Sequence, residues 1–292
     1  ENIELLSLYV VPQSTQFMVG CKRTMKNAKN ESHIDYYIDV MKFNSRFELI
    51  SLQKIQCGGA PKVFGYFNGS ILVGINRHIY HMISQGDGPE PKWHLNLNVA
   101  LSSLPTGCSF LEICDDVVWI VDTTQSFFCF IRKQNPNDGR YSLHPVATDT
   151  KPKQLTAICV LNRAMVATGD KFGTIEILRL PDDVVCDRKW RMIQPPDRDI
   201  YMPKTCILIS LASFNIGEAV TSIFRNGRNN TLFYTSILGQ IGALIPIKDE
   251  EASTTLQTAS STIKAGFEKE FALMKRKKFE HMDISVLDLD AI

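Results

Sequence analysis

The chain has 292 residues, of which 44% are hydrophobic and 22% are charged, and its formal net charge is +1. A charge so close to zero excludes a strong overall field that would steer the protein onto nucleic acid or an anionic membrane. No apolar run reaches the roughly 18 residues of a membrane helix, and no signal peptide follows Glu1, where an initiator Met is also missing. Eight scattered cysteines without C-x-x-C spacing favour a reducing compartment, either cytosol or nucleus.

The first repeat unit contains four apolar segments, IELLSLYVV, QFMVGCK, HIDYYIDVMKF and FELISLQKI. Each is rich in Val, Ile, Phe and Tyr, as strands are, and we expect a long exposed loop over Thr24–Ser32. Three-strand units with short Asn-, Gly-, Asp- and Ser-containing connectors then repeat over Lys62–Ile83, Ser109–Arg132, Leu155–Arg179 and Ala219–Ile247.

The central strands of these four units begin at Ile71, Val117, Ala164 and Thr231, so the spacings are 46, 47 and 67 residues. A Pro-rich and charged insertion, Asp182–Pro203, accounts for the longest spacing. Candidate fourth strands lie near Trp93, Tyr141 and Ser210.

Four antiparallel strands in each unit predict an all-β fold of about five β-propeller blades. No segment reads as a strand that closes the ring, so we expect missing blades to come from chain upstream of Glu1. With unpaired blade edges exposed, we also expect that the chain does not fold stably alone.

After Pro246 the period-two alternation ends and a helical pattern begins. Ile263, Phe267, Phe271 and Met274 fall on one stripe, and capping oxygens occur over Asp249–Ser253. These features predict a helix from about Thr255 to Phe279, although Gly266 inside it weakens the helix.

Asp170, Lys171, Phe172 and Gly173 separate two predicted strands. Asp170 could act as a general base, but the pattern favours a tight hairpin in which Gly173 takes positive φ and Asp170 accepts hydrogen bonds from backbone amides.

Two further polar pairs resemble sites. His78 and His81 could hold a metal, but residues three apart on a strand point to opposite faces, and no Cys, Asp or Glu at ligand spacing joins them. Asp115 and Asp116 resemble a catalytic carboxylate pair, but their place between two strands favours a polar turn.

The basic cluster Lys275–Lys278 could be a nuclear-import signal or an RNA contact, or simply a solvated helix end. The sequence has no phosphate-binding glycine motif and no nucleophile elbow. We therefore predict no catalytic, cofactor-binding or metal-binding residues, and no enzyme activity.

The segment from FFCFIRKQ to GDKFGTIEILRLP resembles the C-terminal region of subunit 3 of splicing factor 3b, the Rse1 family. The family's most specific motif, a DKFG hairpin followed by RLP, is matched by Asp170, Lys171, Phe172, Gly173, Arg179, Leu180 and Pro181. Upstream KVFGYFNGSILVGI, downstream FNIGEAVTSI and the tail LDLDAI keep the family's order. Leu289 departs from the family's D-G-D pattern.

The resemblance implies that residues 1–247 are blades of the third β-propeller of a longer protein and that residues 248–292 begin its helical domain. It implies a nuclear, non-catalytic scaffold in the U2 small nuclear ribonucleoprotein. Its partners there would be a HEAT-repeat subunit and a small helical subunit, with U2 and pre-mRNA contacted indirectly during branch-site recognition. Partner-binding residues do not carry over, because the matched motif is structural.

Other readings remain open. Relatives of the same architecture include adaptors of cullin ubiquitin ligases and a subunit of the mRNA 3′-end cleavage and polyadenylation complex, which lack DKFG at this hairpin. A propeller hydrolase would need polar residues at matched blade tops, and none recurs. The G-H…W-D signature of ordinary WD40 repeats is absent.

Overall fold

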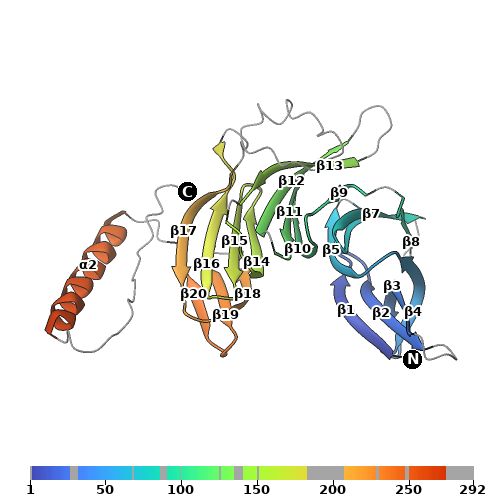
Figure 1. Cartoon of the computed structure of the whole chain (residues 1–292), viewed down its shortest axis with the longest axis horizontal. Coiled ribbons are helices and arrows are strands. Elements are labelled where there is room, and N and C mark those ends of the chain that lie inside the picture. The colour runs from blue at the N-terminus through green and yellow to red at the C-terminus, as the bar shows by residue number, and fades with distance from the viewer. Residues whose placement is uncertain are drawn as a thin grey trace.

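The computed structural model describes residues 2–26, 32–67, 69–85, 91–98, 100–124, 126–134, 141–149, 151–182, 207–227, 230–246 and 250–273. Within these ranges the strands form five antiparallel sheets, which we call blades 1 to 5 in chain order. Figure 1 shows the blades following one another in an open arc, with blade 1 and blade 5 at its two ends.

Each blade is a meander in which consecutive strands pair along the chain, apart from one short strand of blade 2. Blade 1 consists of β1 (Asn2–Val10), β2 (Gln16–Lys26), β3 (Ser32–Phe43) and β4 (Leu49–Cys57). Blade 2 consists of β5 (Pro61–Phe67), β6 (Ser70–Ile75), β7 (His78–Gln85), β8 (Lys92–Leu95) and β9 (Ser102–Ser103). Blade 3 consists of β10 (Cys108–Cys114), β11 (Val117–Asp122), β12 (Ser126–Gln134) and β13 (Tyr141–Thr148). Blade 4 consists of β14 (Leu155–Asn162), β15 (Met165–Asp170), β16 (Thr174–Arg179) and β17 (Ile209–Asn215). Blade 5 consists of β18 (Val220–Arg225), β19 (Leu232–Ser236) and β20 (Ile241–Leu244).

The main hydrophobic clusters lie between consecutive blades, and each draws side chains from two sheets. Between blades 3 and 4, for example, Trp119 and Phe127 pack in one cluster with Val166 and Leu178. The second strands of blades 2, 3 and 4 are buried at every position, because a neighbouring blade covers each of their faces. This burial explains why those strands are mainly apolar rather than alternating, with polar residues near their ends.

A glycine permits one close approach between blades. A Cβ atom at Gly169 of blade 4 would lie 2.5 Å from a methyl group of Val220 in blade 5, closer than real Cβ atoms come. A side chain there would force the two sheets apart.

The predicted all-β fold and its repeat are confirmed. Each of the second strands β6, β11, β15 and β19 begins within one residue of the predicted position, and β8, β13 and β17 are the predicted fourth strands. The insertion after Asp182 lies outside the described residues up to Ile207. Closure of the arc into a ring remains a prediction.

Two details of the strand prediction are wrong. The loop expected over Thr24–Ser32 is shorter, because Thr24 pairs with Ile34 and Lys26 pairs with Ser32 as β2 and β3 continue. The candidate strand near Trp93 was expected to cover WHLNLNV, but it ends at Leu95, where the side chain of Asn96 accepts a hydrogen bond from the Asn98 amide and turns the chain.

The turn at Asn96 leads to β9, a short strand that the sequence did not predict. β9 pairs with the beginning of β7, whereas β8 pairs with its end. The outer edge of β7 is therefore covered by two separate short strands.

Helix α2 (Glu250–Leu273) follows blade 5 and stands apart from the sheets in Figure 1. It begins five residues before the predicted Thr255, so Glu250–Ser253 belong to its first turn instead of preceding it. Ile263 of the predicted apolar stripe is exposed. The side chains of its other members, the predicted end at Phe279, the basic cluster Lys275–Lys278 and the tail from Leu287 lie outside the described residues.

Candidate protein-binding surface

The hairpin between β15 and β16 contains the first half of the family motif and has the predicted geometry. Oδ1 of Asp170 accepts hydrogen bonds from the amides of Phe172 and Thr174, both at 2.8 Å. Gly173 has φ +89°, a conformation that residues with a Cβ avoid. The Asp170 carboxylate is committed to the turn, which supports the structural interpretation over that of a general base.

The second half of the motif begins at the last residue of β16 and anchors the strand end in the core. Leu180 is fully buried in the cluster between blades 3 and 4, and its amide donates to the carbonyl of Ala164 at 2.8 Å. The guanidinium of Arg179 pairs with Asp182 at 3.3 Å. Pro181 is half-buried at the point where the described chain leaves the blade.

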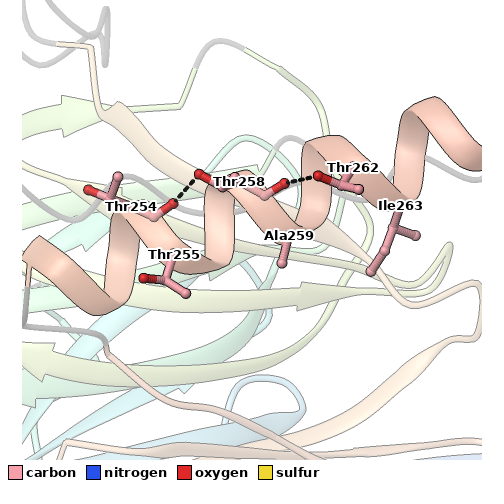
Figure 2. Close-up of a pocket in the computed structure, with 6 residues that line it drawn as sticks. All are labelled: Thr254, Thr255, Thr258, Ala259, Thr262 and Ile263. Carbon is pink, nitrogen blue, oxygen red and sulfur yellow. Dashed lines mark hydrogen bonds between the residues drawn. The ribbon is translucent and has the colours of Figure 1, made fainter.

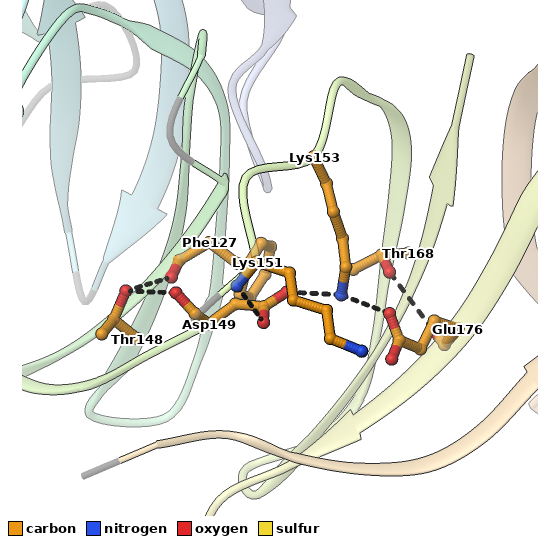
Figure 3. A network of polar contacts seen from close by, with 7 residues as sticks. All are labelled: Phe127, Thr148, Asp149, Lys151, Lys153, Thr168 and Glu176. Carbon is orange, nitrogen blue, oxygen red and sulfur yellow. Dashed lines mark hydrogen bonds and ion pairs between the residues drawn. The ribbon is translucent and has the colours of Figure 1, made fainter. Parts of the chain in front are cut away.

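An ionic network lies at the connection between blades 3 and 4 (Figure 3). The ammonium of Lys153 contacts the carboxylate of Asp149, which follows β13, and that of Glu176 on β16. All three side chains are largely buried. Burial alone would lower the pKa of Lys153, but hydrogen bonds to the two carboxylates outweigh it and raise the pKa above its usual value.

A second ion pair joins blades 3 and 4 at the opposite ends of their strands. Arg163, in the β14–β15 turn, donates from Nε and Nη2 to the two carboxylate oxygens of Asp116 at 2.8 and 2.9 Å. Asp115 takes positive φ in the β10–β11 turn. The adjacent aspartates are thus turn residues, and one of them anchors a neighbouring blade.

Blades 2 and 3 are joined by an arginine held between two aromatic rings. The guanidinium carbon of Arg132 lies 3.6 Å from the ring centroid of Phe67 and 3.3 Å from that of Tyr141. Burial lowers the pKa of Arg132, and Tyr141 partly opposes this shift. Such stacking favours Arg over Lys, because the planar guanidinium covers both rings.

The two histidines do not converge. Nδ1 of His78 shares a hydrogen bond with Oγ of Ser103 at 2.6 Å, whereas the ring of His81 contacts the edge of Tyr141. Burial lowers the pKa of both imidazoles. The positive charge of Arg77 lowers the pKa of His78 further, and that of Arg132 does the same for His81. Among the described residues no group of three or more His, Cys, Asp or Glu side chains could hold a metal ion.

The described cysteines are free thiols held in their neutral form. Burial raises the pKa of Cys57 to about 12, and it also raises the pKa of Cys108 and of Cys129. A thiol with a raised pKa is a poor nucleophile, so these residues act as small core side chains.

A surface hollow runs along α2 and is lined by residues of that helix alone (Figure 2). The hydroxyls of Thr258 and Thr262 donate to the carbonyls four residues earlier, both at 2.8 Å. These hydroxyls are therefore engaged with the helix backbone and do not converge on a common point. The lining residues are Thr254, Thr255, Thr258, Ala259, Thr262 and Ile263.

Large apolar side chains are exposed at both ends of the arc. Leu8 and Val10 are exposed on β1 of blade 1, and Phe224 is exposed on β18 of blade 5, where it stacks on Phe233 at 5.4 Å between ring centroids. Ile237 and Leu238 are exposed at the turn after β19. Reasoning from the sequence could not find these surfaces, because their exposure depends on which blades have neighbours.

The described structure thus defines a propeller-like, all-β protein whose blades are joined by shared cores and ion pairs. A model of the family described as the CPSF A subunit region matches residues 7–279, so the chain belongs to that family. No helix among the described residues has the length and apolar character needed to cross a membrane.

Several proteins with similar sequences carry the names of the family that the DKFG–RLP motif indicated. The chain is 28% identical to the pre-mRNA-splicing factor RSE1 of Mycosarcoma maydis over 226 residues, which are 74% of this chain and 18% of that protein. It is 28% identical to splicing factor 3B subunit 3 of Danio rerio over 210 residues, 68% of this chain and 16% of the relative. A probable splicing factor 3B subunit 3 of Dictyostelium discoideum is 26% identical over 246 residues, 80% of this chain and 18% of the relative. The resemblance is confirmed, and the chain spans less than a fifth of the length of these relatives.

Proposed function

We propose that the chain is part of a non-catalytic scaffold of the SF3b complex in the U2 small nuclear ribonucleoprotein, acting in the nucleus in pre-mRNA splicing. The match to relatives named as splicing factors over two thirds or more of the chain carries this proposal. The described site chemistry agrees with it, because the motif residues hold turns and strands together.

The same reasoning extends the proposal to partners and to branch-site recognition. Blades fixed to one another by ion pairs present their turns at constant positions, which suits a platform for several proteins. The proposed partners are the HEAT-repeat subunit and the small helical subunit of the complex, with U2 and pre-mRNA contacted indirectly.

Residues 1–247 are, in this proposal, blades of the third propeller of the longer protein, and residues 248–292 begin its helical domain. The apolar side chains exposed on the outer faces of blades 1 and 5 support a larger ring, since a further blade would cover them. The isolated chain is then expected to show no sharp monomeric thermal transition. A cooperative melt of the monomer would contradict the larger ring.

The test of function is gentle purification of the tagged full-length protein, followed by identification of the associated proteins and RNA, with an untagged extract as control. Recovery of U2 small nuclear RNA together with a HEAT-repeat protein is the expected result. Recovery of polyadenylation factors or a cullin without that RNA would instead establish the alternative function. The matching family model is named after the CPSF A subunit, so the family match is shared with that alternative.

A further inference from the structure

The turns between the second and third strands differ sharply from blade to blade. Blade 2 has the polar pair Asn76–Arg77 there, and blade 3 has Thr123–Thr124. Blades 4 and 5 instead present large apolar side chains, with Phe172 66% exposed, Ile237 67% exposed and Leu238 79% exposed. Tight turns favour polar residues, so three exposed apolar side chains at two neighbouring turns require a reason other than turn geometry.

These two turns are joined through the connector that leads from blade 4 to blade 5. The amide of Ile216 donates to the carbonyl of Gly173 at 2.8 Å, and the amide of Ile237 donates to the carbonyl of Ala219 at 2.9 Å. A Cβ atom at Gly173 would lie 2.6 Å from the backbone nitrogen of Glu218. The two turns therefore lie beside the same connector, at the same end of blades 4 and 5.

The charges that a partner would meet beside this surface are cationic. Lys171 and Lys151 are exposed, and the Lys171 amide donates to the carbonyl of Gln154 at 3.1 Å, which brings the connector before blade 4 beside the hairpin. The carboxylate of Asp170 is engaged by backbone amides, and that of Glu218 accepts a hydrogen bond from the hydroxyl of Ser236.

The other two carboxylates near this surface form ion pairs within the protein. Asp149 and Glu176 hold the ammonium of Lys153 in the network of Figure 3, where Lys151 is drawn beside them. Asp149 and Glu176 are ion-paired and largely buried, and Asp170 is buried in its turn. Glu218 is half-buried and hydrogen-bonded, whereas Lys151 and Lys171 are both exposed, so the surface complements acidic side chains.

We propose that this surface, which we call the rim patch and which consists of Phe172, Ile237, Leu238, Lys151 and Lys171, binds an acidic peptide segment of a partner protein. An apolar side chain of the segment packs against Phe172, Ile237 and Leu238. Carboxylates of the same segment pair with the two lysines. Two of the three apolar tips are aliphatic, and aliphatic side chains give bases no stacking platform, which favours protein over RNA. The proposal deepens the scaffold function proposed above and rests on it.

The first experiment places a photo-crosslinking residue at Leu238 in the full-length protein within its native assembly, with Thr124 of the polar blade 3 turn as the matched control position. Crosslinks from position 238, but not 124, to one acidic segment of a partner are expected. Equal crosslinking from both positions, capture of a segment without acidic residues, or crosslinks to RNA would overturn the rim patch. A preparation without any associated protein would contradict the scaffold function as well.

The second experiment reverses charge with the double variant Lys151→Glu and Lys171→Glu. Loss of two contacts at the edge of an interface is expected to reduce the partner recovered by about tenfold. Replacing the acidic residues of the crosslinked segment by lysine should restore recovery. The control Arg77→Glu, at the equivalent turn of blade 2, should leave recovery unchanged. An unchanged yield with the double variant, or no rescue by the reversed segment, would refute the proposal.

Discussion

Blades 3 and 5 contain the same meander but bury their second strands differently. In β11 of blade 3 all six residues are buried, whereas in β19 of blade 5 buried and half-buried residues alternate. The reason is the number of neighbours, because blade 3 is covered on both faces and blade 5 on the face toward blade 4. An apolar run therefore indicates a strand that is packed between two neighbouring sheets. An alternating strand indicates a sheet with one face that no other blade covers.

Truncation of the largest fully buried side chain should give the largest difference between the two blades. Trp119→Ala in β11 is expected to lower the free energy of unfolding by about 3–5 kcal/mol, because it empties a packed core. Phe233→Ala in β19 removes a half-buried ring and should cost about 1 kcal/mol. Hydrogen exchange of the full-length protein, followed in peptides from both strands, measures the two effects, and equal costs would break the comparison.

The ion network between blades 3 and 4 provides the next largest effect. Lys153→Ala leaves the carboxylates of Asp149 and Glu176 buried without their cation and is expected to cost about 3 kcal/mol. The triple variant Lys153→Met, Asp149→Asn and Glu176→Gln removes the charges together and should recover most of the loss. If the triple variant is as unstable as the single one, the loss comes from packing rather than from charge.

The same network predicts a pH dependence with a definite sign. The folded-state pKa of Lys153 is raised above its ordinary value of 10.5, so its contribution is fully present below pH 10.5 and is lost as pH rises through the folded-state value. Comparing wild type with the triple variant at increasing alkaline pH should show their stabilities converging.

A smaller effect is expected where blades 2 and 3 meet. Arg132→Ala removes a guanidinium stacked on two rings and should cost about 2 kcal/mol, whereas Arg132→Lys should retain part of that stability. Protection of β6 and β12 from hydrogen exchange reports the effect. A lysine variant as stable as wild type would show that charge alone, without stacking, holds these blades.

The smallest effect is expected at the motif hairpin of blade 4. Asp170→Ala leaves the amides of Phe172 and Thr174 without their acceptor at a solvent-accessible turn, which should cost about 1 kcal/mol. Asp170→Asn keeps an acceptor oxygen and should cost less. Exchange of the Thr174 amide checks both variants, and a loss much larger than predicted would mean that the hairpin supports blade 5 as well.

Features that depend on local chemistry could be predicted from the sequence. The starts of β6, β11, β15 and β19 follow from short apolar runs bounded by turn residues. The hairpin at Asp170 follows from Asp and Gly at fixed turn positions. Both kinds of signal lie within a few residues, so no knowledge of the assembled fold is needed.

Features that depend on how the blades stack could not be predicted. Asp116 and Arg163 are 47 residues apart, and only the contact between blades 3 and 4 joins them. The rim patch likewise arises because turns from two blades meet across a connector. β9 was missed for a different reason, since two serines carry neither an apolar period nor a turn signal.

Cores shared between consecutive blades also bear on how the chain acquires its structure. Within a blade the strands other than β9 pair with their neighbours in sequence, so a meander closes early, at a low entropic penalty for loop closure. The apolar face of the newest blade stays open until the following blade emerges from the ribosome and covers it. Synthesis from the N-terminus would therefore assemble the array in order, with one aggregation-prone face exposed at a time.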